Sequence, residues 1–288
     1  MQRLRLTTAG ESHGPGLTAI LTGLPAGLTL DMDFVQHELA RRQHGHGRGR
    51  RMQIESDQVD IHGGVRNRET LGSPIALWVP NRDFANWSGI MDPLSTDPRR
   101  TESRRLRSPR PGHADLAGGL KYDRRDLRDI LERASARESV ARVAAGAIAK
   151  LLLREFDVAI RSGVRFLGEV GSDSSPPTRE DLLAMDDTSP LRAIDPELEP
   201  QMLELVDRAK ERGDTVGGAV TVIAHNVPAG LGSHVQWNEK LDGRLAQAVM
   251  SVPAVKAVEI GAATSTSRGP GSEAHDPIEF VDGRGWQR

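Results

Sequence analysis

The sequence predicts an α+β fold, with sheets and helices packed in layers and all 288 residues in one domain. Two observations support this fold class. Stretches that alternate every second residue, as strands do, recur along the chain together with stretches of helical periodicity. The two kinds of stretch alternate without the regular strand–helix–strand rhythm of a doubly wound sheet.

The first half of the chain is predicted to hold mainly strands. Leu17–Leu24 (LTAILTGL) is predicted to be a strand or a strand pair that ends at the turn Pro25-Ala26-Gly27. Asp31 or Asp33 is predicted to cap a helix that runs to Arg42. Residues 52–61 (MQIESDQVDI) indicate a β-hairpin, and 74–79 (PIALWV) a strand. Residues 92–111 are predicted to be loop, because they contain four prolines, six arginines and little periodicity.

The second half mixes both kinds of element. Helical periodicity dominates from Arg125 to Phe156. Further helices are predicted near 200–212 and 240–250, and further strands near 158–166, 219–224 and 255–260.

The long helical segment is predicted to break at Ser135. Its first part places Leu127, Ile130, Leu131 and Ala134 on one face, and its second part places Ala136, Val140, Val143, Ala147 and Leu151 on a different face. Ser135-Ala136-Arg137-Glu138 has the pattern of a capping box, which predicts a new helix start at Ser135. The free N–H groups of a helix start suit an anion, so the neighbouring arginines Arg133 and Arg137 indicate a phosphate site.

The composition is that of a soluble protein. Hydrophobic residues make up 37%, charged residues 27%, and the net charge is −2. The chain has no cysteine, which excludes disulfides and thiolate chemistry and suits the cytoplasm. Neither a signal peptide nor an apolar run long enough to cross a membrane is expected.

The segment Gly10-Glu11-Ser12-His13-Gly14 fits G-x-S-x-G, the pattern of the nucleophile elbow in α/β-hydrolases. Such an elbow needs preceding strands and an oxyanion loop, but Ser12 has almost no chain before it. A serine hydrolase is therefore the weaker interpretation, and His13 becomes the residue of interest.

Two further segments concentrate arginine and histidine. Residues 42–51 (RQHGHGRGRR) form a glycine-rich loop suited to phosphate or carboxylate. Its two histidines have no third ligand at useful spacing, so no metal is expected. In Arg110-Pro111-Gly112-His113, the turn presents His113 beside several cations, which disfavour its protonated form.

Several long motifs together resemble the chorismate synthase family. They are GESHGPGLTAILTGLPAG, RRQHGHGRGRRMQIESDQV, RPGHADLAGGLKY, LERASARESVARVAAGAIAK, GGAVTVIAHNVPAGLG and KLDGRLAQAVMSVPAVKAVEIG. The resemblance runs from Leu4 to about Asp276. It implies a β-α-β-α sandwich, a homotetramer, and an enzyme that uses reduced FMN, with NADPH as a candidate reductant of the flavin.

The resemblance also assigns residues. His13 is expected near the substrate phosphate and His113 near the flavin. The residues expected to hold the substrate are Ser12, Arg42, Arg48, Arg110 and Arg137. Those expected to contact the flavin are Arg133, Ala134, Ser135, Gln247 and Ala248.

The implied reaction is the anti-1,4-elimination of phosphate from 5-enolpyruvylshikimate 3-phosphate. A substrate with a phosphate and two carboxylates requires several arginines. His13 is expected to protonate the departing phosphate, and His113 to protonate or hydrogen-bond the reduced flavin.

Two alternatives remain open. Family members continue past the position that matches Arg288 into a segment that contacts the flavin, so the chain as given is expected to fold but to be essentially inactive. The non-enzymatic alternative is a nucleic-acid or other anion-binding protein that uses the two arginine-rich loops. Its affinity would fall steeply with salt.

Overall fold

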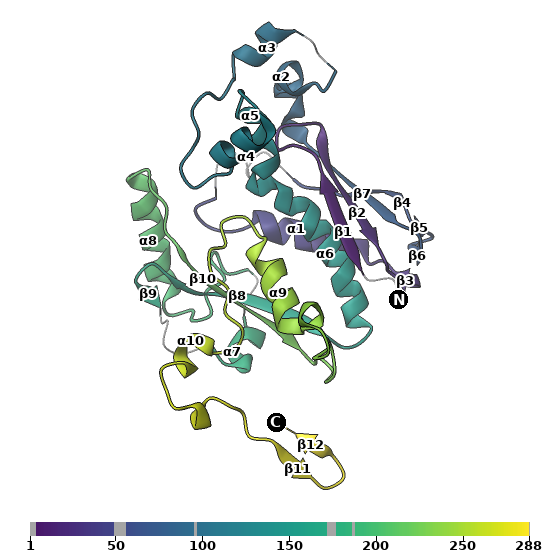
Figure 1. Ribbon diagram of the computed structural model, residues 1–288, viewed down its shortest axis with the longest axis vertical. Helices are drawn as coiled ribbons and strands as arrows, with labels where there is room; N and C mark the ends of the chain where they lie inside the picture. Colours follow the sequence, from purple (N-terminus) through teal and green to yellow (C-terminus); the bar gives the residue numbers. More distant parts are fainter. Residues whose placement is uncertain (1–3, 49–55, 95–96, 172–176, 186–187, 288) are drawn as a thin grey trace.

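The computed structural model is elongated, with a layered body between a helical upper lobe and a C-terminal extension (Figure 1). It describes residues 4–48, 56–94, 97–171, 177–185 and 188–287. No helix in these ranges is both long and apolar enough to cross a membrane.

The first layer is an antiparallel sheet with the strand order β1-β2-β7-β4. Its strands are β1 (Arg5–Ala9), β2 (Gly16–Thr22), β7 (Ile75–Pro80) and β4 (Asp60–Gly63). Every second residue of β2 and β7 is buried, and the register pairs these buried residues with one another, for example Leu17 with Val79 and Leu21 with Ile75. One face of the sheet therefore forms the wall of the main core.

Helices α1 (Met32–Gln43) and α6 (Ser139–Arg154) form the second layer. Asp31 caps α1 by accepting a hydrogen bond from the N–H of Phe34, and Val35 and Leu39 are buried, as predicted. Helix α6 turns mostly alanines towards the core, and these small residues allow it to pack closely against α1 and the sheet.

The third and fourth layers are a second sheet and the helices behind it. The sheet has the order β10-β8-β9, with β8 at Ala159–Leu167, β10 at Gly218–His225 and β9 at Val170–Gly171. On β8, Ser162 accepts a hydrogen bond from Arg41 of α1, whereas the adjacent Gly163 lies against Met185 and Ile194. Neighbouring strand residues point to opposite faces. The sheet therefore lies between α1 and α6 on one side and α7 (Arg179–Leu183) and α8 (Glu199–Glu211) on the other. The predicted β-α-β-α sandwich is confirmed.

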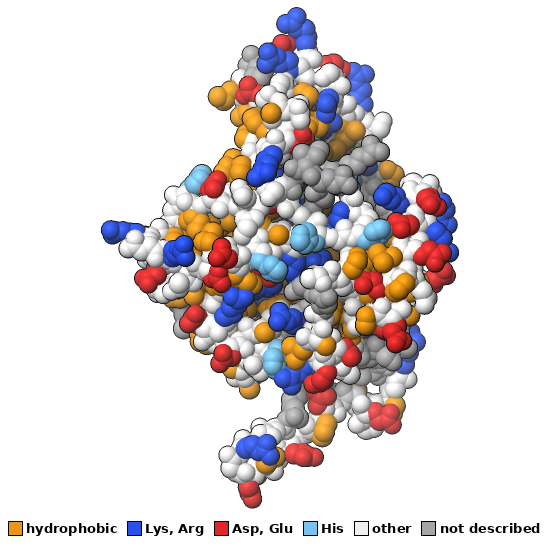
Figure 2. Space-filling model, turned by 180° about the vertical axis from the view of Figure 1, so that it is seen from behind, with side chains coloured by type: hydrophobic (Ala, Val, Ile, Leu, Met, Phe, Trp, Pro, Cys, Tyr) orange, Lys and Arg blue, Asp and Glu red, His pale blue; other side chains and the backbone are white. Residues whose placement is uncertain are grey.

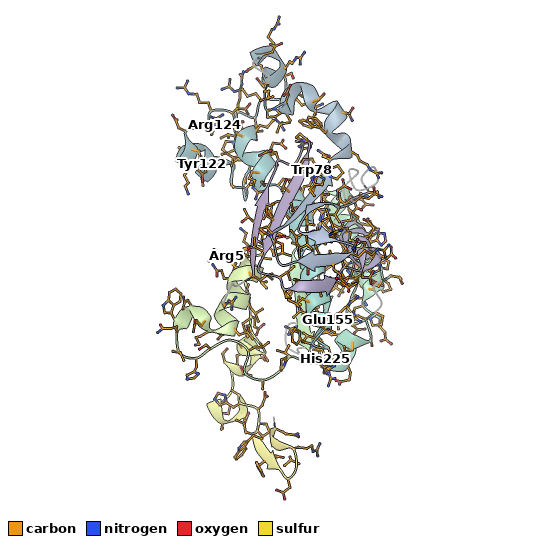
Figure 3. The ribbon with its side chains drawn as sticks, turned by 90° about the vertical axis from the view of Figure 1, so that its right-hand side faces the viewer. Arg5, Trp78, Tyr122, Arg124, Glu155 and His225 are labelled. Carbon is orange, nitrogen blue, oxygen red and sulfur yellow. The ribbon has the colours of Figure 1, made fainter. Side chains whose placement is uncertain are left out.

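The remaining elements surround these layers. A small sheet contains β3 (Ala26–Thr29), β6 (Glu69–Leu71) and β5 (Val65–Arg66). The upper lobe contains η2 (Arg82–Asn86), α2 (Ser88–Met91), α3 (Pro98–Glu102), α4 (Asp115–Tyr122) and α5 (Arg128–Ala134). The C-terminal part contains η4 (Trp237–Glu239), α9 (Leu241–Met250), α10 (Ala263–Thr266), η5 (Gly271–Glu273), β11 (Glu279–Val281) and β12 (Gly285–Gln287). The hairpin β11–β12 projects from the body in both Figure 1 and Figure 3.

Three sequence-based predictions are wrong. Residues 255–260 form no strand. The segment predicted to be a hairpin within 52–61 has no strand at 56–59, and β4 begins at Asp60 and pairs with β7 instead. The other predicted arm lies outside the described residues. The predicted loop at 92–111 contains the short helix α3, which starts at the Asp97 cap and at a proline that suits a first helical turn.

Candidate functional site

The turn between β1 and β2 carries Ser12 and His13. Gly10 has φ +106°, and a Cβ there would lie 2.4 Å from the carbonyl oxygen of Gly16, so only glycine fits. The Asn81 side chain donates hydrogen bonds to the carbonyls of Ser12 and Gly14, at 3.2 and 2.9 Å. The buried Asn81 side chain therefore holds the backbone of this turn.

His13 is held by Glu132 of α5. Its Nδ1 lies 2.8 Å and its backbone N–H nitrogen 2.9 Å from Oε2 of Glu132, whose side chain is 1% exposed. Arg128 donates to the other carboxylate oxygen at 2.8 Å. The imidazole also lies against the Trp87 ring, with centroids 3.9 Å apart.

The Glu132 carboxylate is ionised despite its burial. Burial raises the pKa of this carboxyl, but the hydrogen bonds and charge of His13 and the hydrogen bond from Arg128 outweigh it. The pKa of Glu132 therefore lies below its ordinary value of 4.5.

The predicted helix break at Ser135 lies next to the turn that carries Ser12 and His13. Ser135 is extended and accepts a hydrogen bond from the N–H of Arg137 at 3.3 Å, and the helix resumes through the 3-10 turn η3 (Ala136–Glu138). The Ser135 hydroxyl lies 3.1 Å from that of Ser12. Two segments that are distant in the sequence thus form one site.

The capping box itself is only half formed. The Glu138 side chain does not bond back to Ser135: it accepts hydrogen bonds from Thr8 at 2.8 Å and from Arg142 at 2.9 Å. Arg133 donates to the backbone oxygen of Thr8 at 3.0 Å, and this hydrogen bond joins Arg133 to strand β1. Ala136, predicted to lie on the buried face, is exposed.

Arg42 and Arg137 share one buried carboxylate. Asp57, with a side chain 1% exposed, lies 3.0 Å from Arg42 and 3.2 Å from Arg137. Arg42 also donates to Ser139 at the start of α6, at 3.1 Å. The positions of both arginines are therefore determined before a ligand binds.

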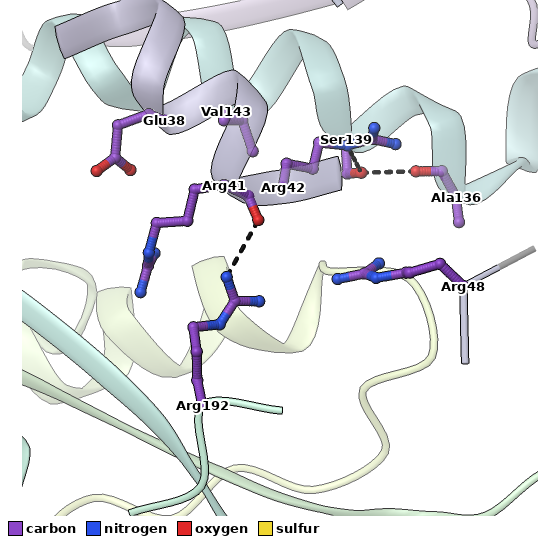
Figure 4. Close-up of a pocket in the computed structure, with 8 residues that line it drawn as sticks. All are labelled: Glu38, Arg41, Arg42, Arg48, Ala136, Ser139, Val143 and Arg192. Carbon is purple, nitrogen blue, oxygen red and sulfur yellow. Dashed lines mark hydrogen bonds between the residues drawn. The ribbon is translucent and has the colours of Figure 1, made fainter. Parts of the chain in front are cut away.

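A cavity of about 250 Å³ opens beside this cluster (Figure 4). Its lining is Glu38, Arg41, Arg42, Arg48, Ala136, Ser139, Val143 and Arg192. Four guanidinium groups in so small a space suit a multiply charged anion. Arg48 and Arg42 thus line the same cavity, whereas residues 49–51 of the same loop lie outside the described residues.

His113 is held like His13. Its Nδ1 lies 2.6 Å from the buried Asp115, which also accepts from the side chain and backbone of Arg110 at 2.9 and 3.1 Å. Burial raises the pKa of Asp115, but the hydrogen bonds from Arg110 and His113 lower it further, and the net pKa is below the ordinary value. Asp115 starts α4, which packs against α5 through Gly118 and Ile130.

Gln247 and Ala248 lie on α9, outside the cluster around Ser135. The Ala248 carbonyl accepts from Ser251, whose hydroxyl accepts from Arg142 at 2.6 Å. Arg142 in turn pairs with Glu138. A continuous set of contacts therefore leads from α9 to the Arg133 region.

Histidine and basic side chains also gather near the middle of the face in Figure 2.

Sequence reasoning missed the acidic residues Asp57, Asp115 and Glu132. Asp115 was detectable, because it stands two positions after His113 and a carboxylate at that spacing can reach the ring. Glu132 is 119 residues from His13, so no local pattern indicates that contact.

The serine-hydrolase and nucleic-acid-binding interpretations find little support in this geometry. Ser12 is 2% exposed, unlike the exposed nucleophile of a hydrolase elbow. In the 92–111 segment, the arginines Arg99, Arg100, Arg105 and Arg107 form ion pairs with Asp97 or Glu102, which weakens the electrostatic attraction to nucleic acid.

Comparisons with known proteins agree with one another. A family model described as chorismate synthase matches residues 4–286. The chorismate synthase of Brevibacillus brevis is 50% identical over 285 residues, which cover 99% of this chain and 74% of that protein. That of Geobacillus kaustophilus is 51% identical over 286 residues, with coverage of 99% and 74%. A crystal structure of chorismate synthase superposes with a TM-score of 0.80 at 43% identity and covers 100% of this chain and 77% of the other.

Proposed function

The chain belongs to the chorismate synthase family of phosphate-eliminating lyases, and from this premise we propose how its residues convert 5-enolpyruvylshikimate 3-phosphate into chorismate and phosphate. The single observation that carries the proposal is the meeting of the His13 turn with the Ser135 break. It places a general-acid candidate, Ser12 and the first residues of η3 in one rigid site.

His13 is the acid for the leaving phosphate. As the bond between the ring carbon and the phosphate oxygen breaks, negative charge grows on that oxygen, and a proton from the imidazole neutralises it. A general acid of this kind accelerates a reaction by about 10²–10⁴-fold.

The arginines bind the anionic groups of the substrate. Asp57 fixes Arg42 and Arg137, Arg48 lines the adjacent cavity, and Asp115 fixes Arg110. Guanidinium groups with fixed positions bind phosphate and carboxylate at a lower entropic cost than mobile ones.

Residues 133–135 fit a flavin phosphate. The Arg133 side chain is 41% exposed although it is fastened to β1, so its guanidinium is both positioned and reachable. Arg133, Ala134 and Ser135 would hold the cofactor, together with Gln247 and Ala248 of α9. When bound, reduced FMN would supply electron density for the departure of phosphate and a site for the ring proton. His113 would protonate or hydrogen-bond the reduced flavin through the ring nitrogen that is not the one beside Asp115.

The direct experiment is an anaerobic assay of chorismate formation with reduced FMN. Because the chain spans about 74% of the length of its relatives, a second version carries the additional C-terminal residues of the Brevibacillus brevis enzyme. We expect chorismate and phosphate in equal amounts from at least the longer version, and none when Arg137→Met is introduced. Arg124→Met, at an ion pair whose side chains are 56% and 42% exposed, is the control. A folded longer version without turnover would contradict the proposal.

We further propose a homotetramer as the active assembly. Apolar side chains on β10 and α9 are exposed in the single chain, among them Val220 at 64%, Val222 at 57% and Leu245 at 47%. Such surfaces favour association. Sedimentation velocity of the chain measures its assembly, and a monomer at micromolar concentration would contradict the tetramer.

A further inference from the structure

We propose that Glu132 is the positioning residue of His13: its buried carboxylate fixes the imidazole as the Nδ1–H tautomer, so that Nε2 is the nitrogen that transfers the proton. This inference rests on the proposed role of His13 as the acid for the leaving phosphate. It adds a residue to the site that neither the motifs nor the resemblance assigned.

The contacts of Glu132 require a carboxylate. One oxygen accepts from Nδ1 and from the backbone N–H of His13, and the other accepts from Arg128. The backbone N–H of His13 and the Arg128 guanidinium can only donate, and an ionised carboxylate is acceptor-only. Nδ1 must therefore carry a hydrogen in this arrangement.

The orientation of the ring is fixed in a second way. The Trp87 ring covers one face of the imidazole at an interplanar angle of 32°, and its own indole N–H donates to Asp83 at 3.0 Å. The guanidinium of Arg104 lies 4.2 Å from the centroid of the Trp87 ring. Glu132 thus determines the rotation of the imidazole in its plane, and Trp87 determines the plane.

The backbone also ties Glu132 to the turn. The N–H of Ser12 donates to the carbonyl of Glu132 at 2.9 Å, next to the side-chain contacts with His13. Helix α5 and the turn are therefore joined through the backbone as well as through side chains. A substitution of the Glu132 side chain leaves the donor and the acceptor of this backbone contact in place.

The proton balance follows from this geometry. The imidazolium carries hydrogens on both nitrogens, and Glu132 keeps its negative charge opposite the Nδ1–H. The proton on Nε2 passes to the phosphate oxygen as the carbon–oxygen bond breaks, which leaves a neutral imidazole in the Nδ1–H form. The carboxylate stabilises the charged ring before transfer and retains the same hydrogen bond afterwards.

Glutamine cannot replace Glu132 without conflict. If its amide oxygen faces His13, its NH2 group faces the donor Arg128; if the amide is reversed, NH2 faces the two donors of His13. Either orientation leaves a donor opposite a donor. The ring of His13 in Glu132→Gln is then expected to lose its single orientation and its single tautomer.

The first test is nitrogen-15 NMR of the chain labelled at histidine, at a pH where the imidazole is neutral. The His13 resonances are identified by their loss in His13→Ala. We expect a protonated Nδ1 in the unmodified chain and a mixture of tautomers in Glu132→Gln. A protonated Nε2 with a bare Nδ1 in the unmodified chain would overturn the inference, and this measurement does not depend on turnover.

The second test is a double-mutant cycle in kcat, in the version of the chain that turns over. Glu132→Gln is expected to lower kcat by about 10²-fold with a smaller change in KM, as loss of a group that orients a catalytic ligand or base does. In His13→Ala, the same substitution should have no further effect. If the two losses simply multiply, Glu132 does not act through His13 and the inference is wrong.

The outcomes distinguish this inference from the proposed function. Full activity in His13→Ala would remove the proposed role of His13, whatever the tautomer. Glu132→Asp keeps the negative charge on a shorter side chain and should retain more activity than Glu132→Gln. If Glu132→Asp loses as much activity as Glu132→Gln but has the melting temperature of the unmodified chain, the charge at position 132 does not determine the activity. Glu102→Gln, at an exposed glutamate that also contacts two arginines, is the matched control and should leave kcat unchanged.

Discussion

The guanidinium of Arg137 lies 3.2 Å from the carboxylate of Asp57, and both side chains are buried. The other oxygen of that carboxylate contacts Arg42 of α1. One acidic side chain therefore holds two arginines from distant segments at the edge of the anion cavity. A buried cation and a partly buried one stay close together because the negative charge between them offsets their repulsion.

Asp57→Asn is expected to lower the free energy of unfolding by about 3–5 kcal/mol, since it leaves the buried Arg137 and the partly buried Arg42 without their counter-charge. Urea unfolding followed by circular dichroism measures this loss. Asp97→Asn is the control: the partners of Asp97 are mostly exposed, so its loss should be less than about 1 kcal/mol. Similar losses of unfolding free energy in the two variants would mean that the Asp57 cluster stabilises the fold no more than an exposed ion pair does.

His13→Ala is expected to lower kcat by about 10²-fold or more, while KM for the substrate changes less. The reason is that the leaving phosphate needs its acid in the transition state, whereas the arginines provide most of the ground-state binding. Anaerobic steady-state assays with reduced FMN separate the two parameters. A KM effect with an unchanged kcat would make His13 a binding residue.

The sequence predicted most of the longer regular elements, because their periodicity and caps are local. Asp31 starts α1 as its position suggests, and the change of helical face located the break at Ser135. The strand β1 was missed because RLTTA has little apolar alternation; five of its residues pair with β2 through the backbone. Backbone pairing with the next strand leaves no mark in so polar a segment.

The candidate site was predictable only in part. The residues carried over from the resemblance lie around the contact between Ser12 and Ser135, around Asp57, around Asp115 and on α9, but the carboxylates that fix them were not found. Glu138 shows why: its spacing from Ser135 predicts a capping box, yet the side chain binds Thr8 and Arg142 instead. Tertiary partners outweighed the local one, because Thr8 and Arg142 satisfy both carboxylate oxygens at once. Such a choice depends on the folded structure and not on spacing.

The contribution of Glu132 to stability is expected to depend on pH. Its pKa in the folded protein is below the ordinary 4.5, so the ionised carboxylate stabilises the fold above that value and the stabilisation is lost as the pH falls through the lower, folded-state pKa. Glutamine does not titrate. The difference in unfolding free energy between the unmodified chain and Glu132→Gln should therefore shrink as the pH falls below about 4.5. Urea unfolding at a series of pH values measures it, and a difference that grows on acidification would contradict the sign.

Asp115→Asn is expected to weaken substrate binding and turnover together. The carboxylate accepts from both Arg110 and His113, so its loss releases an arginine that is 46% exposed and removes the group that orients the histidine. An asparagine has one acceptor oxygen and cannot hold both partners, and its NH2 group faces a donor on the other side. We expect KM to rise and kcat to fall, each by about 10-fold or more.

Two further variants separate these effects. Arg110→Met should raise KM with a smaller effect on kcat, because it removes the binding group while Asp115 still contacts His113. Asp129→Asn is the control, since its ion pair with Arg124 lies at the surface of the same lobe and both side chains are well exposed. If Asp115→Asn matches Arg110→Met in both parameters, the contact between Asp115 and His113 contributes nothing to turnover. If it lowers kcat further, the carboxylate acts through the histidine as well as through the arginine.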